Sequence, residues 1–448
     1  MSASPEKKAR TEASPAGKIG GVGASSKKLV GWDKFVRHNP KSDRFEMTDF
    51  DHLEFWCLDA TNTARRFSTA FGMTMVASTT IDSGNFKYQG YVLKAGTVTF
   101  SFVAPYWTDA PPPAASAHNF RDPFPDYNRD EALKFLAKHG GLAVKAVALK
   151  VKDAKKAFEE CVANGGVGVT RPTTVGDASG DGLIVYSEVQ YYADVKFRFV
   201  EGRETFKGPF FPGYKTEARP RVDYGLVRID HVVSNVPVLT DVTDHVFKML
   251  GFHEFGEFTA EDVGTVDSGL NSMVMANNEQ TILMPVNEPT TGTRRKSQIQ
   301  SFIEHHCGPG IQHIALTTPD IIGTIKQMVA ASAHGGVEFM PNPGVAYYKE
   351  HVPKKMAGMP EITQELIDDC QKYAILIDRD EEGGLLQIFT KPLLDRPTLF
   401  VEIIQRVGCP GPDGKQKPAC GGFGKGNFGA LFKSIEDWEK IRDGELPA

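Results

Sequence analysis

Two histidines and one glutamate have the residue types and surroundings of a metal site. His231 and His313 stand near the start of strand-like segments, and Glu402 lies within the otherwise apolar, strand-like stretch 398–405. A carboxylate in such a strand is costly to bury unless it is paired, hydrogen-bonded or bound to a metal. Two imidazoles and one carboxylate that converge inside a barrel would form the facial triad that holds non-haem Fe(II) and leaves positions open for reactants.

A purely structural explanation of the same residues stays open at this point. The chain has 12 histidines, and a single histidine is more often a satisfied surface or core residue than a ligand. Glu402 could face solvent on an edge strand, and His313 could bond a backbone carbonyl. A comparison of the two halves of the chain favours the metal site.

The two halves share a repeated pattern. The segment Phe50-Asp51-His52-Leu53 corresponds to Ile229-Asp230-His231-Val232, and Gly72 and Gly251 follow their histidines at the same distance. The residues between have helical spacing, with Thr240 as the expected N-cap, Gly251 as the C-terminal left-handed residue, and one apolar face. That face is formed by Val242, Val246, Phe247 and Leu250.

A second pair of segments repeats the plan with looser spacing. Asp153 and Asp320 each follow an Ala-Leu strand and are expected to cap a helix that ends at a pair of glycines. The unit is a strand, a helix and then several strands, and it recurs near residues 49, 145, 228 and 311. Under this alignment the first half keeps His52 but has Ala146 where the second has His313. Phe199-Val200-Glu201 is the candidate counterpart of Phe400-Val401-Glu402.

These repeats predict an α+β fold of two domains, each built from duplicated βαβββ modules that form an open, barrel-like antiparallel sheet with flanking helices. The expected boundaries are a disordered tail at 1–27, a first domain without a complete metal site at 28–205, a linker at 206–224, a metal-binding catalytic domain at 225–430 and a C-terminal helix or lid at 431–448. An additional helical insertion is expected between His351 and Tyr373.

Composition excludes several classes of protein. Hydrophobic residues make up 41% and charged residues 24% of the 448-residue chain, as in ordinary globular proteins. A net charge of -5 gives no excess of basic residues for nucleic acid, and no apolar stretch approaches the roughly 18 residues of a membrane span. Six scattered cysteines without a Cys-x-x-Cys pair predict reduced thiols. Glu6 and Glu12 interrupt the acid-poor pattern of a transit peptide, so cytoplasm is expected, with a plastid as the alternative.

Beyond these patterns, the chain resembles the 4-hydroxyphenylpyruvate dioxygenase family of the vicinal oxygen chelate superfamily, and the plant and algal forms most. The resemblance covers about residues 28–443. It is carried by the motifs Arg228-Ile229-Asp230-His231, Ser297-Gln298-Ile299-Gln300, Gly310-Ile311-Gln312-His313, Leu386-Gln387-Ile388-Phe389, Phe400-Val401-Glu402 and Gly421-Gly422-Phe423-Gly424-Lys425-Gly426-Asn427-Phe428. The last motif is not a phosphate loop, because it lacks the Gly-Lys-Ser/Thr ending of one.

The resemblance implies roles for particular residues. It implies His231, His313 and Glu402 as ligands of one Fe(II) per chain. It implies Gln298, Gln312 and Gln387 as catalytic polar residues, and a substrate pocket formed by Ser272, Asn287, Phe389, Phe423 and Phe428. Core packing would equally explain any single phenylalanine, since the chain has 29 of them.

The resemblance also implies a reaction, in which 4-hydroxyphenylpyruvate and O2 give homogentisate and CO2. This is a step of tyrosine and phenylalanine catabolism and of plastoquinone and tocopherol supply. A hydroxymandelate synthase-type oxygenase, a glyoxalase-type isomerase using Zn or Ni, and a non-catalytic binding protein are the alternatives. A homodimer is expected by the same resemblance, and neither nucleic acid nor a membrane is expected as a partner.

Overall fold

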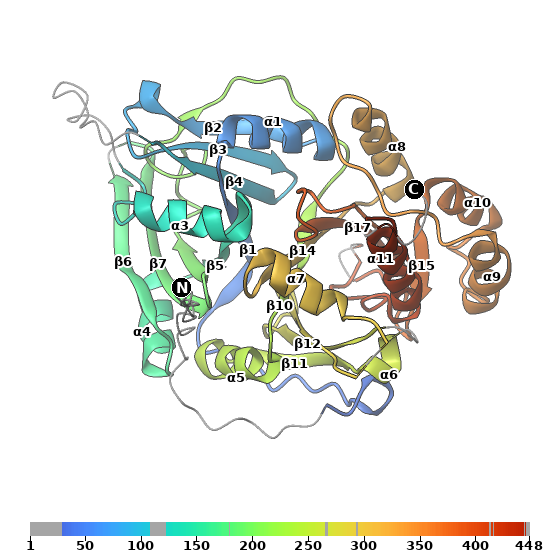
Figure 1. Cartoon of the computed structure of the whole chain (residues 1–448). Coiled ribbons are helices and arrows are strands. Elements are labelled where there is room, and N and C mark those ends of the chain that lie inside the picture. Colours follow the sequence, from blue (N-terminus) through green and yellow to red (C-terminus); the bar gives the residue numbers. More distant parts are fainter. Residues whose placement is uncertain are drawn as a thin grey trace, which may run out of the picture.

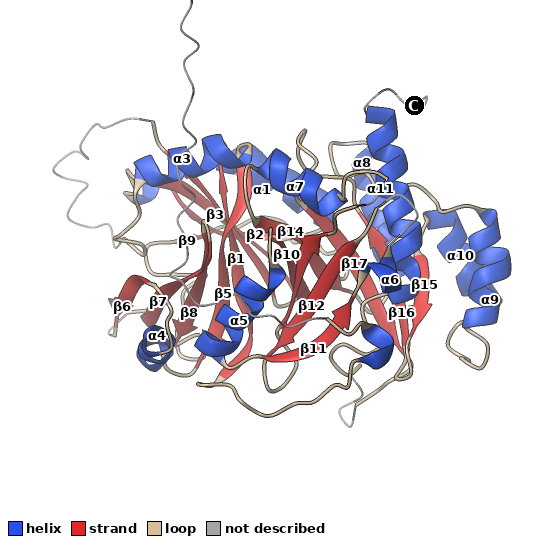
Figure 2. Ribbon diagram, turned by 60° about the horizontal axis from the view of Figure 1, so that its bottom comes forward, coloured by secondary structure: helices blue, strands red, loops and turns tan. Residues whose placement is uncertain are grey.

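The computed structural model describes residues 29–107, 122–178, 180–264, 268–292, 294–411, 414, 416–442 and 444. The tail predicted at 1–27 lies outside these residues. Two sheets lie side by side, one from the first half of the chain and one from the second, and helices cover their outer sides (Figures 1 and 2). The predicted α+β class is confirmed.

Nine strands of the described chain form the first sheet and eight form the second. The first consists of β1 (Met47–Cys57), β2 (Thr74–Thr79), β3 (Tyr88–Ala95), β4 (Val98–Pro105), β5 (Leu142–Val151), β6 (Gly168–Asp177), β7 (Gly182–Tyr192), β8 (Val195–Glu201) and β9 (Lys215–Thr216). The second consists of β10 (Arg228–Asn235), β11 (His253–Phe258), β12 (Leu270–Ala276), β13 (Leu283–Pro289), β14 (Gly310–Thr317), β15 (Leu376–Arg379), β16 (Gly384–Phe389) and β17 (Phe400–Val407).

The two sheets have the same strand order, which matches the repeat seen in the sequence. The first runs β6-β7-β8-β5-β1-β4-β3-β2 with β9 at its edge, and the second runs β15-β16-β17-β14-β10-β13-β12-β11. Both sheets are mixed and not wholly antiparallel as expected, because β1 pairs with β4 and β5 with β8 in parallel, as do β10 with β13 and β14 with β17. The strand-helix-strand part of each module gives β1 and β4, or β10 and β13, the same direction.

The helices of the second half are α5 (Leu239–Leu250), α6 (Ala260–Val263), α7 (Gln298–His306), α8 (Ile321–Ser332), α9 (Val352–Lys355), α10 (Gln364–Tyr373) and α11 (Phe428–Arg442). The first half has α1 (Ala60–Phe71), α3 (Arg129–His139) and α4 (Ala154–Ala163). The insertion expected at 351–373 is α9 and α10, which lie at the outer edge of the second half (Figure 1).

Most of the predicted helix ends are confirmed, whereas two predictions for α5 are wrong. Asp153 and Asp320 accept backbone N–H bonds at the starts of α4 and α8, and Gly251 ends α5 in the left-handed region. The N-cap predicted at Thr240 is wrong, because α5 already begins at Leu239 after Val238. The prediction that Phe247 belongs to the buried face is also wrong: it is 50% exposed, because its position faces away from β12 and β13.

One hydrophobic core is continuous through both halves, and it includes Phe55 and Phe199 from the first sheet as well as Val232 and Ile403 from the second. Helices also pair across the boundary, α1 with α8 and α4 with α5. The expected linker at 206–224 packs against the first half: β9 pairs with β2. The domain boundaries themselves stay a prediction.

The cysteines differ from the sequence expectation. Cys409 and Cys420 form a disulfide, whereas Cys57, Cys161, Cys307 and Cys370 are free. The prediction of reduced thiols is therefore wrong for this pair. After β17 the chain reverses direction through a bridge between Pro410 and Gln416, and this reversal brings the two cysteines together. Their spacing in the sequence does not indicate a disulfide. In the described part of the chain, every helix is too short or too polar to span a bilayer.

Candidate metal centre and substrate pocket

Three neighbouring strands of the second sheet bring the predicted ligands together. His231 on β10 lies opposite Ala315 on β14, and Ala315 lies opposite Glu402 on β17. His313 stands two residues before Ala315, so it projects from the same face of β14. The sheet register thus places two imidazoles and one carboxylate on one concave face.

The three side chains converge within bonding reach of a single ion. Their ligand atoms lie within 4.8 Å of one another. The Nε2 atoms of His231 and His313 are 3.1 and 3.4 Å from Glu402 Oε2. His231 and Glu402 are buried, and 12% of the His313 side chain is exposed. Two imidazole nitrogens and a carboxylate suit a divalent transition metal, so the residues fit a metal centre.

Buried carboxylates make the centre favourable for positive charge, which in the absence of a metal ion is a proton on His231. Burial opposes ionisation of Glu402, but hydrogen bonds from His231 and His313 outweigh it and lower its pKa to about 2. Burial lowers the pKa of His313. Burial also acts against protonated His231, but bonds to Asp230 and Glu402 prevail and raise that pKa to about 9. The carboxylate is ionised at neutral pH, as metal binding requires, and the surrounding acids favour positive charge at this point.

A set of hydrogen bonds behind the ligands fixes their orientation. His231 Nδ1 is 2.8 Å from Asp230 Oδ1, which leaves Nε2 directed at the centre. Arg406 donates to both oxygens of Asp230, at 2.9 and 2.6 Å, and also to the carbonyls of Cys420 and Gly422. Partners of this kind hold a histidine ligand in one tautomer and one orientation. Here they also join the ligand to the Gly-rich segment at 421–427.

The other two ligands have partners of their own. Gln387 Nε2 donates to Glu402 Oε1 at 3.0 Å, and Asn427 Nδ2 donates to Gln387 Oε1 at 3.0 Å. His313 Nδ1 lies 3.0 Å from Gln312 Oε1. Gly424 approaches Gln387 so closely that a Cβ at this position, where φ is +73°, would collide with the amide.

A small cavity opens beside the three ligands. Its walls come from β10–β14, β16, β17 and the segment 423–428. It is lined by His231, Val233, Phe258, Ser272, Val274, Pro285, Asn287, His313, Gln387, Phe389, Glu402, Phe423, Gly424, Asn427 and Phe428. Its volume is about 40 Å³, whereas pockets for small molecules typically measure about 300–1,000 Å³. An aromatic ligand can enter only if part of this wall moves.

All five residues predicted for the substrate pocket lie in this lining, namely Ser272, Asn287, Phe389, Phe423 and Phe428. Of the three glutamines predicted as catalytic, Gln387 lies there as well, whereas Gln298 and Gln312 do not. Gln312 contacts His313 from behind, and Gln298 lies in the first turn of α7. The roles assigned to these side chains stay predictions.

Sequence reasoning assigned no role to Asp230 or Arg406. It also missed part of the cavity lining, namely Val233, Phe258, Val274, Pro285, Gly424 and Asn427. One signal for Asp230 was present, because an Asp precedes the His in both halves. Arg406 follows Glu402 on the same strand, but its contact with Asp230 depends on the packing of β17 near β10 through β14. No local pattern reveals such a contact.

The comparisons with known proteins agree with this geometry. Residues 228–353 match the Glyoxalase/Bleomycin resistance protein/Dioxygenase superfamily. The chain is 48% identical over 422 residues to 4-hydroxyphenylpyruvate dioxygenase of Daucus carota, which covers 92% of each chain. The Arabidopsis thaliana enzyme of the same name is 46% identical, covering 92% of this chain and 93% of its own. The chain belongs to the 4-hydroxyphenylpyruvate dioxygenase family.

A solved structure extends the comparison of folds. A mutant of 4-hydroxymandelate synthase from Streptomyces coelicolor matches with a TM-score of 0.70 at 23% identity, over 88% of this chain and 99% of its own. That likeness shows the shared fold. As a member of the 4-hydroxyphenylpyruvate dioxygenase family the chain is an enzyme, and a dioxygenase of this superfamily requires a metal, for which His231, His313 and Glu402 offer the donors.

Proposed function

We propose that this enzyme converts 4-hydroxyphenylpyruvate and O2 to homogentisate and CO2, a step of tyrosine catabolism, with one Fe(II) per chain held by His231, His313 and Glu402. The observation that carries the proposal is the buried group of two imidazoles and one carboxylate in a chain that matches dioxygenases of this name over more than nine-tenths of its length. A two-histidine, one-carboxylate set with open positions is typical of non-haem Fe(II) oxygenases.

Different residues would hold the metal ligands in place and bind the substrate ring. Bound Fe(II) would supply coordination positions for the 2-oxo acid group and the redox chemistry with O2. Asp230 keeps His231 in the tautomer whose Nε2 faces the centre, and Gln387 orients Glu402. Phe389, Phe423 and Phe428 would flank the aromatic ring.

The polar residues of the pocket would orient the substrate, and its apolar residues would keep it dry. Ser272 and Asn287 lie opposite each other on β12 and β13 and would bind polar groups of the substrate. Val233 and Val274, with the three phenylalanines, exclude water from the reacting atoms. Gln298 and Gln312 are also proposed as catalytic polar residues, by the resemblance alone, since neither lines the 40 Å³ cavity.

Anaerobic titration with Fe(II) followed by 4-hydroxyphenylpyruvate tests the proposal. A visible metal-to-ligand charge-transfer band is expected, because the 2-oxo acid group would bind the iron through two oxygens. O2 should then be consumed with formation of homogentisate. An iron-loaded, folded protein without the band would contradict bidentate binding of the keto acid.

Two related enzymes remain as alternatives in this test. A glyoxalase-type isomerase would be active with Zn or Ni and consume no O2. A hydroxymandelate synthase would consume O2 but oxidise the side chain, and product analysis by mass and retention distinguishes it. Sequence identity of 46–48% with the dioxygenases, against 23% with the synthase structure, favours the dioxygenase.

We also propose that 431–448 acts as a lid with the segment before it. The 40 Å³ cavity has Phe423 and Phe428 in its wall, and α11 continues directly from Phe428. Truncation before Gly421 should leave a folded, iron-binding protein that consumes more O2 per homogentisate formed. An unchanged ratio in a soluble truncated protein would contradict the lid.

A homodimer and a cytoplasmic location complete the proposal. The dimer rests on the resemblance to the plant enzymes, and sedimentation velocity measures it. The location rests on Glu6 and Glu12 within the N-terminal sequence. Imaging of a C-terminally tagged full chain distinguishes cytoplasm from plastid.

A further inference from the structure

The N-terminal strap, residues 30–37, lies against the second half of the molecule although it precedes the first sheet. The backbone N–H of Val30 donates to Glu257 Oε2 at 2.8 Å. Arg37 Nε donates to the carbonyl of Phe255 at 3.2 Å, and its guanidinium lies 3.8 Å above the Phe255 ring. The strap therefore runs along β11 and α6, beside the metal-binding half (Figure 1).

Trp32 of the strap supports the aromatic wall of the cavity. Its ring stacks on Phe258, with centroids 4.9 Å apart and an interplanar angle of 10°. Phe258 in turn contacts Phe428 at 5.5 Å and Phe423 at 6.5 Å. Since all three phenylalanines line the cavity, Trp32 stands directly behind the wall that would face the substrate ring.

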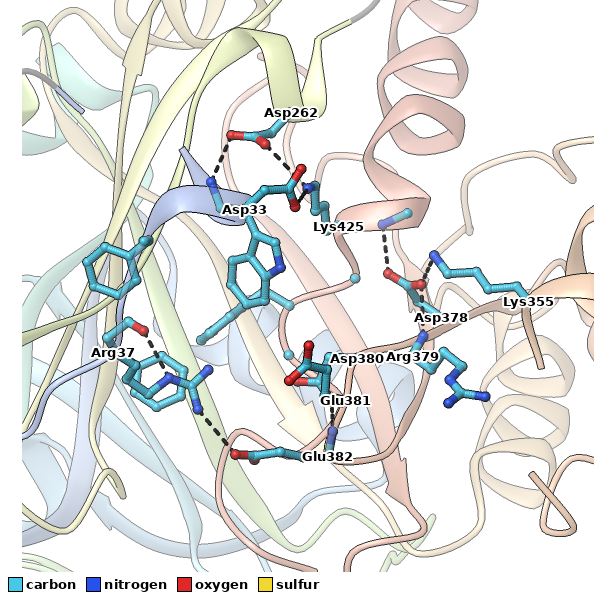
Figure 3. A pocket seen from close by; sticks show the side chains of 18 residues that line it. Asp33, Arg37, Asp262, Lys355, Asp378, Arg379, Asp380, Glu381, Glu382 and Lys425 are labelled. Atoms are coloured by element: carbon cyan, nitrogen blue, oxygen red, sulfur yellow. Dashed lines mark hydrogen bonds and ion pairs between the residues drawn. The ribbon is translucent and has the colours of Figure 1, made fainter. Parts of the chain in front are cut away.

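A charged clasp holds the Gly-rich segment to the same strap. Lys425 Nζ lies 2.8 Å from Asp33 Oδ1 and 3.3 Å from Asp262 Oδ1 (Figure 3). Asp262 also accepts the backbone N–H of Trp32 at 3.1 Å. Gly31, with φ of +83°, is needed here because a Cβ would lie 2.8 Å from Asp262 Oδ2. The strap, α6 and residue 425 are thus tied at one point.

The clasp stands between two cavities of very different size. A groove of about 950 Å³ is lined by Trp32, Asp33, Arg37, Asp262 and Lys425, and also by Phe423 and Gly424. Phe423 and Gly424 line the 40 Å³ cavity as well. A segment only a few residues thick therefore separates the ligands from a large open groove, and the strap holds that segment.

We propose that Trp32 and the Lys425 clasp are positioning residues, which set the place of Phe258, Phe423 and Phe428 around the substrate ring. The inference rests on the proposed function. The Lys425–Asp262 contact carries more of the effect than Lys425–Asp33, because the Asp262 side chain is 11% exposed and that of Asp33 is 80% exposed. Loss of the strap contacts loosens the wall while the metal ligands keep their own hydrogen bonds.

The test compares Trp32→Ala and Lys425→Met with a control on the same stretch of chain. Lys41→Met is the control, because Lys41 pairs with Glu279 at 3.2 Å in an exposed contact away from both cavities. In the iron-loaded full chain, Trp32→Ala should raise KM about tenfold and Lys425→Met by less, with more O2 consumed per homogentisate. Iron content and kcat should change less than KM. Trp32→Phe and Lys425→Arg should restore both values.

Hydrogen exchange of the amides in 421–427 gives a readout that needs no turnover. Exchange should rise in Trp32→Ala and Lys425→Met and stay at the wild-type level in Lys41→Met. Unchanged KM and O2 ratio in a folded variant would overturn the proposal, as would an equal effect of Lys41→Met. If Trp32→Ala does not fold, Lys425→Met decides. A wild-type protein that makes no homogentisate contradicts the proposed function instead, and the exchange data then show whether the strap orders the segment.

Discussion

The two halves of the molecule share one strand order and one Asp-His pair, but different side chains surround the histidine. In the second half, Asp230 accepts from His231 and is held by Arg406. In the first half Asp51 lies 2.5 Å from His52 Nδ1 and is held by Arg203 at 2.7 and 2.8 Å. The support for a predicted histidine ligand is therefore present twice. Among the residues that the structure describes, a complete set of two histidines and one carboxylate occurs in the second half alone.

The difference lies in two strand positions. His52 pairs with Ala148 on β5, and Ala148 pairs with Arg198 on β8, as His231 pairs with Ala315 and Ala315 with Glu402. Arg198 is thus the counterpart of Glu402, and the expected match through Glu201 is wrong. Glu201 instead accepts the backbone N–H of Ala154. Ala146 occupies the place of His313.

A guanidinium takes the place of a metal ion in the first half. Arg198 Nη1 lies 3.1 Å from His52 Nε2 and 2.7 Å from Glu54 Oε2, and Nε donates to Glu188 Oε1 at 2.8 Å. At the position where the second half has the carboxylate of Glu402, the first half has the permanently charged Arg198, which Glu54 and Glu188 neutralise. A duplicated sheet can therefore keep its geometry while one copy satisfies its centre internally.

The largest effect is expected where the second half is given the residue of the first. His313→Ala reproduces Ala146 and should lower turnover at least about a thousandfold, since loss of even a supporting residue costs 10–100-fold. His231→Ala should act likewise, with little loss of folded structure. Turnover, metal content and circular dichroism measure this. His245→Ala, at a half-exposed position of α5, is the control. Normal turnover of an iron-loaded His313→Ala protein would contradict the assignment of His231, His313 and Glu402 as the metal ligands.

A substitution at the centre of the first half should lower the free energy of unfolding and leave turnover per folded molecule unchanged. Arg198→Met removes the guanidinium shared by the buried carboxylates of Glu54 and Glu188, although Glu188 keeps its ion pair with Lys196. The loss should cost about 3–5 kcal/mol of unfolding free energy, measured with denaturant. Adding Glu54→Gln and Glu188→Gln should recover much of the loss. Arg221→Met removes an exposed pair with Asp223 and should change stability by less than about 0.5 kcal/mol. A loss of turnover per folded molecule in Arg198→Met would mean that the first half takes part in catalysis.

Lowering the pH should destabilise the folded protein by protonating the carboxylates of the same ion pairs. Burial raises the pKa of Glu188, but Lys196 and Arg198 outweigh it and lower the pKa to about 2 from the ordinary value of 4.5. The stabilisation is complete above pH 4.5 and is lost as pH falls towards 2, by up to about 3 kcal/mol. The difference in unfolding free energy between wild type and Glu188→Gln should shrink over this interval. A difference independent of pH would show that Glu188 is not ionised in the folded protein.

The smallest effect is expected for His52→Ala. Turnover should stay within about twofold of wild type, and stability should fall by about 1–2 kcal/mol because Asp51 loses a buried hydrogen-bond partner. Steady-state kinetics and denaturant unfolding measure both. A large loss of activity in the folded variant would indicate a functional site in the first half.

Local signals in the sequence determined much of this molecule. Asp153 and Asp320 begin helices and Gly251 ends one, since these effects depend on a few neighbouring backbone groups. The repeat and the apolar strand around Glu402 identified the ligand candidates, because a carboxylate among buried residues needs a partner.

Tertiary structure alone decided the rest. Arg198 matches Glu402 only through the register of paired strands, and a shift along one strand would have placed Glu201 there. The contact of Trp32 with Phe258, the disulfide of Cys409 with Cys420 and the bond of Arg406 to Asp230 each join residues whose spacing carries no pattern. The position of Gln298 on α7, outside the lining of the 40 Å³ cavity, likewise could not be predicted from its sequence motif. Such contacts arise from how sheets and loops pack, which neighbouring residues in the chain do not encode.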